Sequence, residues 1–159
     1  MTDANSPSWL AAIRRYLLFV AGASLVWEAA QLPLYTIWRQ GTPSEIAFAV
    51  VHCTGGDILI ALTALMASLV LVGSQAWPAE GLWRVGALTI ASGLSYTIFS
   101  EWLNIEIRGS WAYSELMPTL PLIDAGLAPF SQWIVIPLAA LWWAGKPISL
   151  NASAKERHT

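Results

Sequence analysis

The chain contains long apolar segments separated by short groups of polar and helix-breaking residues. A helix needs about 20 apolar residues to cross the hydrocarbon of a bilayer. Four segments meet this length: 16–37, 45–72, 83–104 and 127–144. Only 11% of the residues are charged and 56% are hydrophobic, whereas about a quarter of the residues in soluble domains are charged. The sequence therefore predicts an all-α integral membrane protein: residues 1–145 form a four-transmembrane-helix bundle, and 146–159 form a polar cytoplasmic tail.

Lysine and arginine residues are divided unequally between the two ends of the predicted bundle. Arg39 and Arg108 lie at one end. The other end has more of them: Arg14, Arg15, Arg84, Lys146, Lys155 and Arg157. Cytoplasmic loops carry the excess of positive charge in membrane proteins. We therefore predict that both termini lie in the cytoplasm, that the membrane is the bacterial inner membrane, and that the long loop between the third and fourth spans lies outside.

Tryptophan residues fall near the ends of the predicted spans, where amphipathic rings prefer the membrane interface. Those expected at the inner boundary are Trp77, Trp83, Trp142 and Trp143. Those expected at the outer boundary are Trp38, Trp102, Trp111 and Trp133. The pattern predicts an aromatic belt at each interface.

Four ionisable residues interrupt the apolar spans: Glu28, His52, Asp57 and Glu101. An ionised side chain at the centre of a spanning helix costs roughly 2.5–3.5 kcal/mol on insertion scales, so such residues usually face the bundle interior. The rise of about 1.5 Å per helical residue places all four in the outer half of the membrane. We predict that they share one outward-facing pocket, in which Glu28 and Glu101 act as acid and base with support from Asp57 and His52.

Other polar and aromatic residues are predicted to reach the same layer. Ser24, Glu28, Gln31 and Tyr35 follow spacings of four, three and four, which places them on one helix face. The loop between the third and fourth spans is long for a small bundle, and long loops are often functional. The predicted substrate-binding residues are Gln31, Tyr35, Tyr96, Asn104, Trp111, Tyr113 and Gln132.

Glycine and proline residues predict local departures from regular helices. Pro33 cannot donate to the carbonyl of Ala29, so we expect a bend there. The sequence Thr54-Gly55-Gly56 would let the backbone approach a neighbour closely or unwind. Gly93 is expected to serve close helix packing.

Several classes of site are disfavoured by composition. His52 is the only histidine within the spans, and no Glu-x-x-His pair is present, so no metal site is predicted. The net charge of -2 gives no attraction to nucleic acid. No dinucleotide or phosphate-binding fingerprint occurs, and any cofactor stays unknown.

Three functions agree with these features. The first is an enzyme that acts on a lipophilic substrate, an isoprenoid or an acyl lipid. The second is a binding module, small transporter or proton relay, and the third is an accessory subunit of a larger membrane complex. Membrane lipids are expected partners in each case, and a homo-oligomer is compatible with a bundle of this size.

The chain resembles an uncharacterised family of small four-helix bacterial inner-membrane proteins. The resemblance rests on the motifs WEAAQLPLY, VHCTGGD, FSEWLN, GSWAYSELMP and QWIVIP. A more limited similarity links residues 109–113, Gly-Ser-Trp-Ala-Tyr, to carotenoid-modifying membrane enzymes such as the lycopene cyclases. This chain has Gln132-Trp133 where the cyclase pattern has an acidic pair, so the similarity implies an acidic membrane site without implying cyclisation.

Overall fold

A computed structural model describes residues 8–147, and that part of the chain is helical without a strand. The predicted tail residues 148–159, including Lys155 and Arg157, lie outside the described residues. The helices are α1 (Trp9–Gln31), a 3-10 turn (Leu32–Leu34), α2 (Ile37–Gln40), α3 (Pro43–Val72), α4 (Leu82–Trp102), a π-helical turn (Leu103–Ile107) and α5 (Leu127–Ala144).

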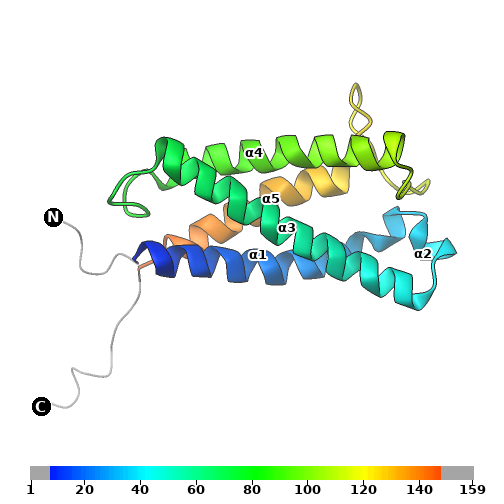
Figure 1. The fold of residues 1–159 in the computed structure, drawn as a ribbon, viewed down its shortest axis with the longest axis horizontal. Helices are drawn as coiled ribbons and strands as arrows, with labels where there is room; N and C mark the ends of the chain where they lie inside the picture. Colours follow the sequence, from blue (N-terminus) through cyan, green and yellow to red (C-terminus); the bar gives the residue numbers. More distant parts are fainter. Residues whose placement is uncertain (1–7, 148–159) are drawn as a thin grey trace, which may run out of the picture.

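The four long helices lie side by side along the long axis of the molecule (Figure 1). Helix α1 packs against α3 and α5, and α4 packs against the same two helices. Helix α3 crosses the bundle diagonally, so that it meets α4 near the turn 73–81 and lies nearer α1 at its own beginning (Figure 1). Three helical segments are long and apolar enough to span a membrane: Trp9–Leu34, Pro43–Val72 and Leu127–Ala144. The prediction of an all-α fold is confirmed for the described residues, and three helical segments have the length and composition that a membrane span requires.

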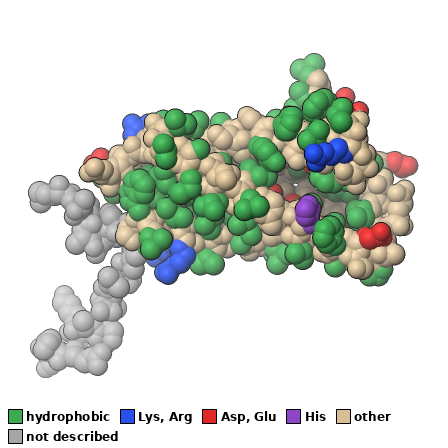
Figure 2. Space-filling model, in the orientation of Figure 1, with side chains coloured by type: hydrophobic (Ala, Val, Ile, Leu, Met, Phe, Trp, Pro, Cys, Tyr) green, Lys and Arg blue, Asp and Glu red, His purple; other side chains and the backbone are tan. Residues whose placement is uncertain are grey.

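Many large apolar side chains lie on the outside of the bundle, and polar side chains lie among those buried inside it. Large apolar side chains cover the outside, as Figure 2 shows on one face, and Leu18, Val26 and Val70 are among those exposed. Buried polar residues occur on every long helix: Ser24, Glu28, Gln31, Thr54, Asp57, Ser68, Thr89, Thr97, Glu101 and Gln132. Exposed apolar side chains of this number and size, spread along the long helices, are suited to contact with lipid.

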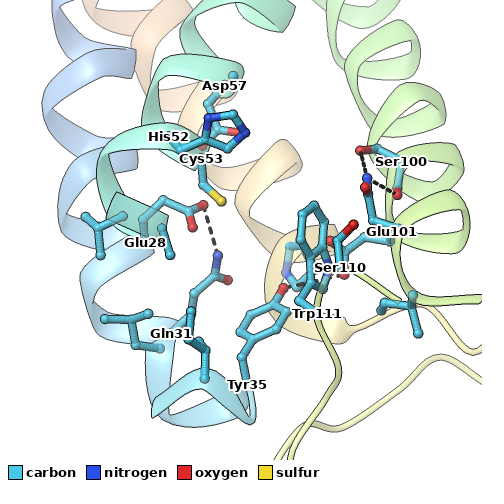
Figure 3. Close-up of a pocket in the computed structure, with 18 of the residues that line it drawn as sticks. Glu28, Gln31, Tyr35, His52, Cys53, Asp57, Ser100, Glu101, Ser110 and Trp111 are labelled. Carbon is cyan, nitrogen blue, oxygen red and sulfur yellow. Dashed lines mark hydrogen bonds between the residues drawn. The ribbon is translucent and has the colours of Figure 1, made fainter. Parts of the chain in front are cut away.

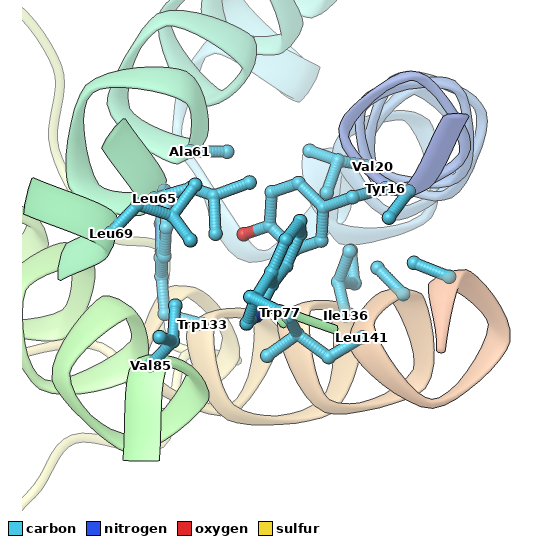
Figure 4. Packing of buried hydrophobic residues seen from close by; sticks show 13 residues of the cluster. Tyr16, Val20, Ala61, Leu65, Leu69, Trp77, Val85, Trp133, Ile136 and Leu141 are labelled. Carbon is cyan, nitrogen blue, oxygen red and sulfur yellow. The ribbon is translucent and has the colours of Figure 1, made fainter. Parts of the chain in front are cut away.

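One half of the bundle, next to the turn 73–81, is filled by buried apolar side chains (Figure 4). We call this set the apolar cluster: Ala12, Tyr16, Val20, Ala61, Leu65, Leu69, Trp77, Val85, Trp133, Ile136, Ala140, Leu141 and Ala144. Gly93 of α4 faces the Trp133 ring, and a Cβ at that position would lie 2.3 Å from ring carbons. Close packing at Gly93 therefore agrees with the sequence prediction.

The ends of α1 differ from the predicted span 16–37. The helix begins at Trp9, because the Ser8 hydroxyl accepts a hydrogen bond from the backbone N–H of Ala11 and caps it. It ends at Gln31, because Pro33 supplies no N–H and the chain continues as a 3-10 turn. Pro33 therefore terminates the α-helix, where the sequence predicted a bend.

Two further sequence predictions are wrong. Helix α3 runs without interruption through Gly55 and Gly56, and a Cβ at either position would meet nothing within 4 Å, so the backbone neither unwinds nor approaches a neighbour closely. Trp77 and Trp133 do not belong to an interfacial belt, because both are buried in the apolar cluster. The Trp77 ring reaches into the apolar cluster from the turn 73–81, and the Trp133 ring packs against Gly93 between α4 and α5, where close packing gives each ring many contacts.

Candidate functional site

The other half of the bundle contains a cavity of about 1340 Å³. Its opening lies between α3 and α4, where Phe48, His52 and Tyr96 line it and are exposed. Figure 2 shows the hollow from this side, with an exposed histidine at its edge and acidic side chains inside it. The interior wall is formed by α1 and α5, through residues that include Glu28, Gln132 and Trp133.

Two buried carboxyl groups share one amide in the cavity wall. The Gln132 side-chain nitrogen donates to Glu28 Oε1 at 3.1 Å and to Asp57 Oδ2 at 2.6 Å. Gln31 Nε2 donates to the same Glu28 oxygen at 2.9 Å. Residues from α1, α3 and α5 therefore form one hydrogen-bonded group that we call the carboxyl–amide cluster: Glu28, Gln31, Asp57 and Gln132. All four side chains are buried.

A third carboxyl group, Glu101 of α4, lies on the opposite side of the cavity (Figure 3). Its Oε2 atom accepts hydrogen bonds from the Tyr35 and Tyr113 hydroxyls. Burial, and then the hydrogen bond to Glu101, raises the pKa of Tyr113, so this phenol stays protonated and keeps its donor. The Tyr113 oxygen also accepts from the backbone N–H of Gly126 at 2.8 Å, which connects Glu101 to the start of α5.

The loop between α4 and α5 closes the end of the cavity by bonding to the end of α1. Ser114 donates its backbone N–H to Leu34 O at 2.9 Å and its hydroxyl to Pro33 O at 3.0 Å. Thr36 N donates to Ala112 O at 3.0 Å. The two bonds from Ser114 satisfy carbonyl groups that follow the interrupted helix, and the bond from Thr36 satisfies a carbonyl group of the loop. The same loop places Trp111 in the cavity, between Gln31 on one wall and Glu101 on the opposite wall (Figure 3).

The structure gathers the residues that the sequence singled out, but it gives them different environments. Every predicted site residue lines the cavity except Tyr113, which lies behind Glu101. His52 is exposed and stacks on Phe48, with ring centroids 5.3 Å apart. Tyr96 is also exposed at the opening, whereas Asn104 is buried and donates to Ser100 O at 2.8 Å.

Some lining residues are not among the predicted substrate-binding residues. Thr97 is buried at the cavity wall and its hydroxyl has no partner among the described residues. Trp133 was assigned to a belt although it forms the boundary between the cavity and the apolar cluster. Gly93 is the sequence feature that could have predicted the buried position of Trp133, because a glycine on the facing helix leaves room for the ring.

The cavity offers few groups that would bind a metal or balance negative charge. Within residues 8–147 no group of three or more His, Cys, Asp or Glu side chains is arranged to hold a metal ion. Among the described residues, the only lysine or arginine that lines the cavity is Arg108, which is exposed at its edge. No family model, curated protein or solved structure matches the chain.

Proposed function

We propose that the protein is a multi-pass protein of the bacterial inner membrane that binds a lipophilic small molecule in the cavity. The observation that carries the proposal is the position of the opening, which lies between two helices whose outer surfaces are apolar. A bilayer component can enter such an opening sideways without crossing water. Ligand pockets commonly measure about 300–1,000 Å³, so the cavity is large enough for a lipid-sized molecule.

The proposed topology has four spans with both termini in the cytoplasm. Helix α4 has 21 residues, about 31 Å at the helical rise, which is enough to cross the hydrocarbon. Arg15 and Arg84 lie at the apolar-cluster end, where Arg15 donates to Lys146 O, and Arg39 and Arg108 lie at the cavity end. The positive-inside rule then places the cavity towards the periplasm.

The carboxyl groups support acid–base chemistry on the bound molecule. Glu28 and Asp57 share a donor and belong to one cluster, whereas Glu101 is held by two phenols across the cavity. Carboxyl groups in different environments can divide the roles of acid and base. We assign these roles to Glu28 and Glu101, with Asp57 positioned beside Glu28 and His52 at the opening.

The apolar cluster favours a one-sided pocket over a transport path. Tyr16, Leu65 and Leu141 fill the bundle between the cavity and the opposite end, and each is fully buried. A solute or a proton would have to cross this packed region. A binding pocket needs no such passage, so the enzyme or binding hypothesis fits the packing better than the transporter hypothesis.

Adjacent glycines of α3 allow a matched test of binding. Gly56 lines the cavity and Gly55 does not, and a Cβ at either position meets no atom within 4 Å. Native mass spectrometry of the purified protein should detect a bound lipophilic molecule that Gly56→Phe loses and Gly55→Phe retains. Retention of the same molecule by both folded variants, or absence of any molecule from the wild type, would contradict the proposal.

The acid–base assignment is tested by trapping. Glu101→Gln should retain the bound molecule in an unconverted form, which differs in chromatographic retention or in mass from the product found in membranes containing the wild-type protein. Glu115, an exposed glutamate outside the cavity, supplies the matched control Glu115→Gln. Identical bound species in wild type, Glu101→Gln and Glu115→Gln would leave a binding protein without the proposed chemistry.

A further inference from the structure

Several hydrogen-bond donors of the cavity wall are directed at its carboxyl groups, and the Trp111 Nε1 atom and the Thr97 hydroxyl are the buried lining donors without a partner among the described residues. The Gln132 amide group already donates to two carboxyls, and both the Tyr35 and Tyr113 hydroxyls donate to Glu101. These bonds end on one oxygen of each carboxyl group: Glu28 Oε1, Asp57 Oδ2 and Glu101 Oε2. The wall therefore donates to only one oxygen of each carboxyl group. A ligand can donate to the other oxygen of Glu28, Asp57 and Glu101.

A separate acceptor points to the same kind of ligand. Gln31 is only 6% exposed, and its Oε1 atom has no hydrogen-bond partner among the described residues. Its Nε2 atom is oriented by Glu28, so the carbonyl oxygen is directed into the cavity (Figure 3). A buried acceptor without a donor destabilises the site because it has lost its hydrogen bonds to water. A ligand that brings N–H groups would remove this cost, whereas an anionic or purely apolar ligand would not.

Aromatic rings line the same cavity as these acceptors. Tyr35 and Trp111 line the inner part of the cavity, and Phe48 lines its opening. Aromatic faces attract cations within about 6 Å of the ring centroid. Arg108 and His52, the basic residues of the lining, are both exposed at the edge and leave the interior acidic.

On the basis of the proposed lipophilic pocket, we propose that its ligand is an amphiphile with a primary or secondary ammonium headgroup. The headgroup lies between the carboxyl–amide cluster and Glu101, where it donates to Gln31 Oε1 and to the carboxyl oxygens. The hydrocarbon chain leaves between α3 and α4 into the bilayer. This orientation satisfies the buried acceptors and keeps the apolar part of the molecule in an apolar solvent.

Three probes with the same chain separate the contributions of charge and of N–H donors. They are dodecylamine, dodecyltrimethylammonium and dodecan-1-ol, titrated into the full-length protein in nonionic micelles at pH 7 and measured by calorimetry. We expect dodecylamine to bind at least tenfold more tightly than dodecan-1-ol and severalfold more tightly than dodecyltrimethylammonium. Glu28→Gln should reduce the preference for the amine over the alcohol at least fivefold, and Glu115→Gln should leave it unchanged.

The outcomes distinguish this inference from the proposed function. Equal binding of the amine and the alcohol would overturn the ammonium headgroup while retaining a lipophilic pocket. Equal binding of the amine and the trimethylammonium probe would overturn the role of N–H donors. If none of the probes binds to the folded wild type, the lipophilic pocket itself is also contradicted. Should Glu28→Gln fail to fold, the preference of the wild type for dodecylamine over dodecan-1-ol still tests the ammonium headgroup.

Discussion

The two halves of the bundle are built from the same four long helices but are held together differently. In the half next to the turn 73–81, contacts between apolar side chains fill the interior (Figure 4). In the other half, the interior holds a cavity, and the helices are joined by hydrogen bonds among carboxyl, amide and phenol groups. The comparison indicates that packing gives the bundle its stability at one end and leaves the other end free to form a polar site.

Trp133 is the residue at which the two halves meet. It belongs to the apolar cluster and also lines the cavity, and the preceding residue, Gln132, donates to Glu28 and Asp57. Successive residues of α5 thus contribute to opposite kinds of interior. If the halves are energetically distinct, substitutions in the apolar cluster should change stability more than ligand binding, and substitutions in the carboxyl–amide cluster should do the reverse.

Leu65→Ala should have the largest effect on stability. Leu65 is fully buried in the apolar cluster, and its truncation should lower the free energy of unfolding by about 3 kcal/mol, because a cavity replaces packed atoms. Leu71→Ala on the same helix is the control, since Leu71 is exposed on the lipid side. Unfolding in mixed micelles measures both. Similar losses for the two variants would show that this half is not stabilised by packing.

Gly93→Ala tests the boundary between the halves. The new Cβ would overlap the Trp133 ring, so we expect a loss of about 2 kcal/mol from overpacking together with weaker ligand binding as the ring moves towards the cavity. Gly55→Ala is the matched control, because its Cβ meets nothing and alanine favours the helix by about 0.5–1 kcal/mol. A stabilising effect of Gly93→Ala would contradict the close contact between α4 and α5.

Sequence patterns predicted the helices better than their contacts. Residues 127–144 have the same bounds as α5, because the span lies between a glycine at each end and its hydrophobicity is continuous. The polar side chains of Glu28, Asp57 and Glu101 could be assigned to one region because charged groups avoid lipid and their depths are set by the helical rise.

Their partners could not be predicted in the same way. Gln132 is shared between two carboxyls only because its side chain extends from α5 into the bundle interior, where it meets Glu28 of α1 and Asp57 of α3, and this depends on helix packing and not on local sequence. The buried positions of Trp77 and Trp133 have the same origin. The bonds from Ser114 to the carbonyl groups that follow α1 also depend on tertiary structure, whereas the ends of α1 itself are set by the local residues Ser8 and Pro33.

Gln132→Leu should affect the cavity half with a smaller loss of stability. Glu28 and Asp57 lose their common donor, and we expect the free energy of unfolding to fall by about 1.5 kcal/mol. The loss should be smaller when Asp57→Asn is already present, because the two residues act through one bond. A double-mutant cycle measured by unfolding gives the coupling. Purely additive effects would place Gln132 and Asp57 outside a common cluster.

Tyr113→Phe should have the smallest effect on stability, because it removes one hydroxyl and keeps the ring. The hydroxyl donates to Glu101 and accepts from Gly126 N, so its removal should cost about 1 kcal/mol. The pKa of Tyr113 is higher in the folded protein than in the unfolded chain. The stability that the hydroxyl contributes is therefore fully present below about pH 10, the ordinary pKa of a phenol, and is lost as the pH rises through the folded-state pKa.

The measurement compares the unfolding of wild type and Tyr113→Phe at neutral and at strongly alkaline pH. The difference between the two proteins should be largest at neutral pH and should diminish as the phenol ionises. Tyr96→Phe is the control, because Tyr96 is an exposed residue at the cavity opening. A difference that grows with pH would mean that ionisation of Tyr113 favours the folded protein, and Glu101 could not then be the acceptor that holds this phenol.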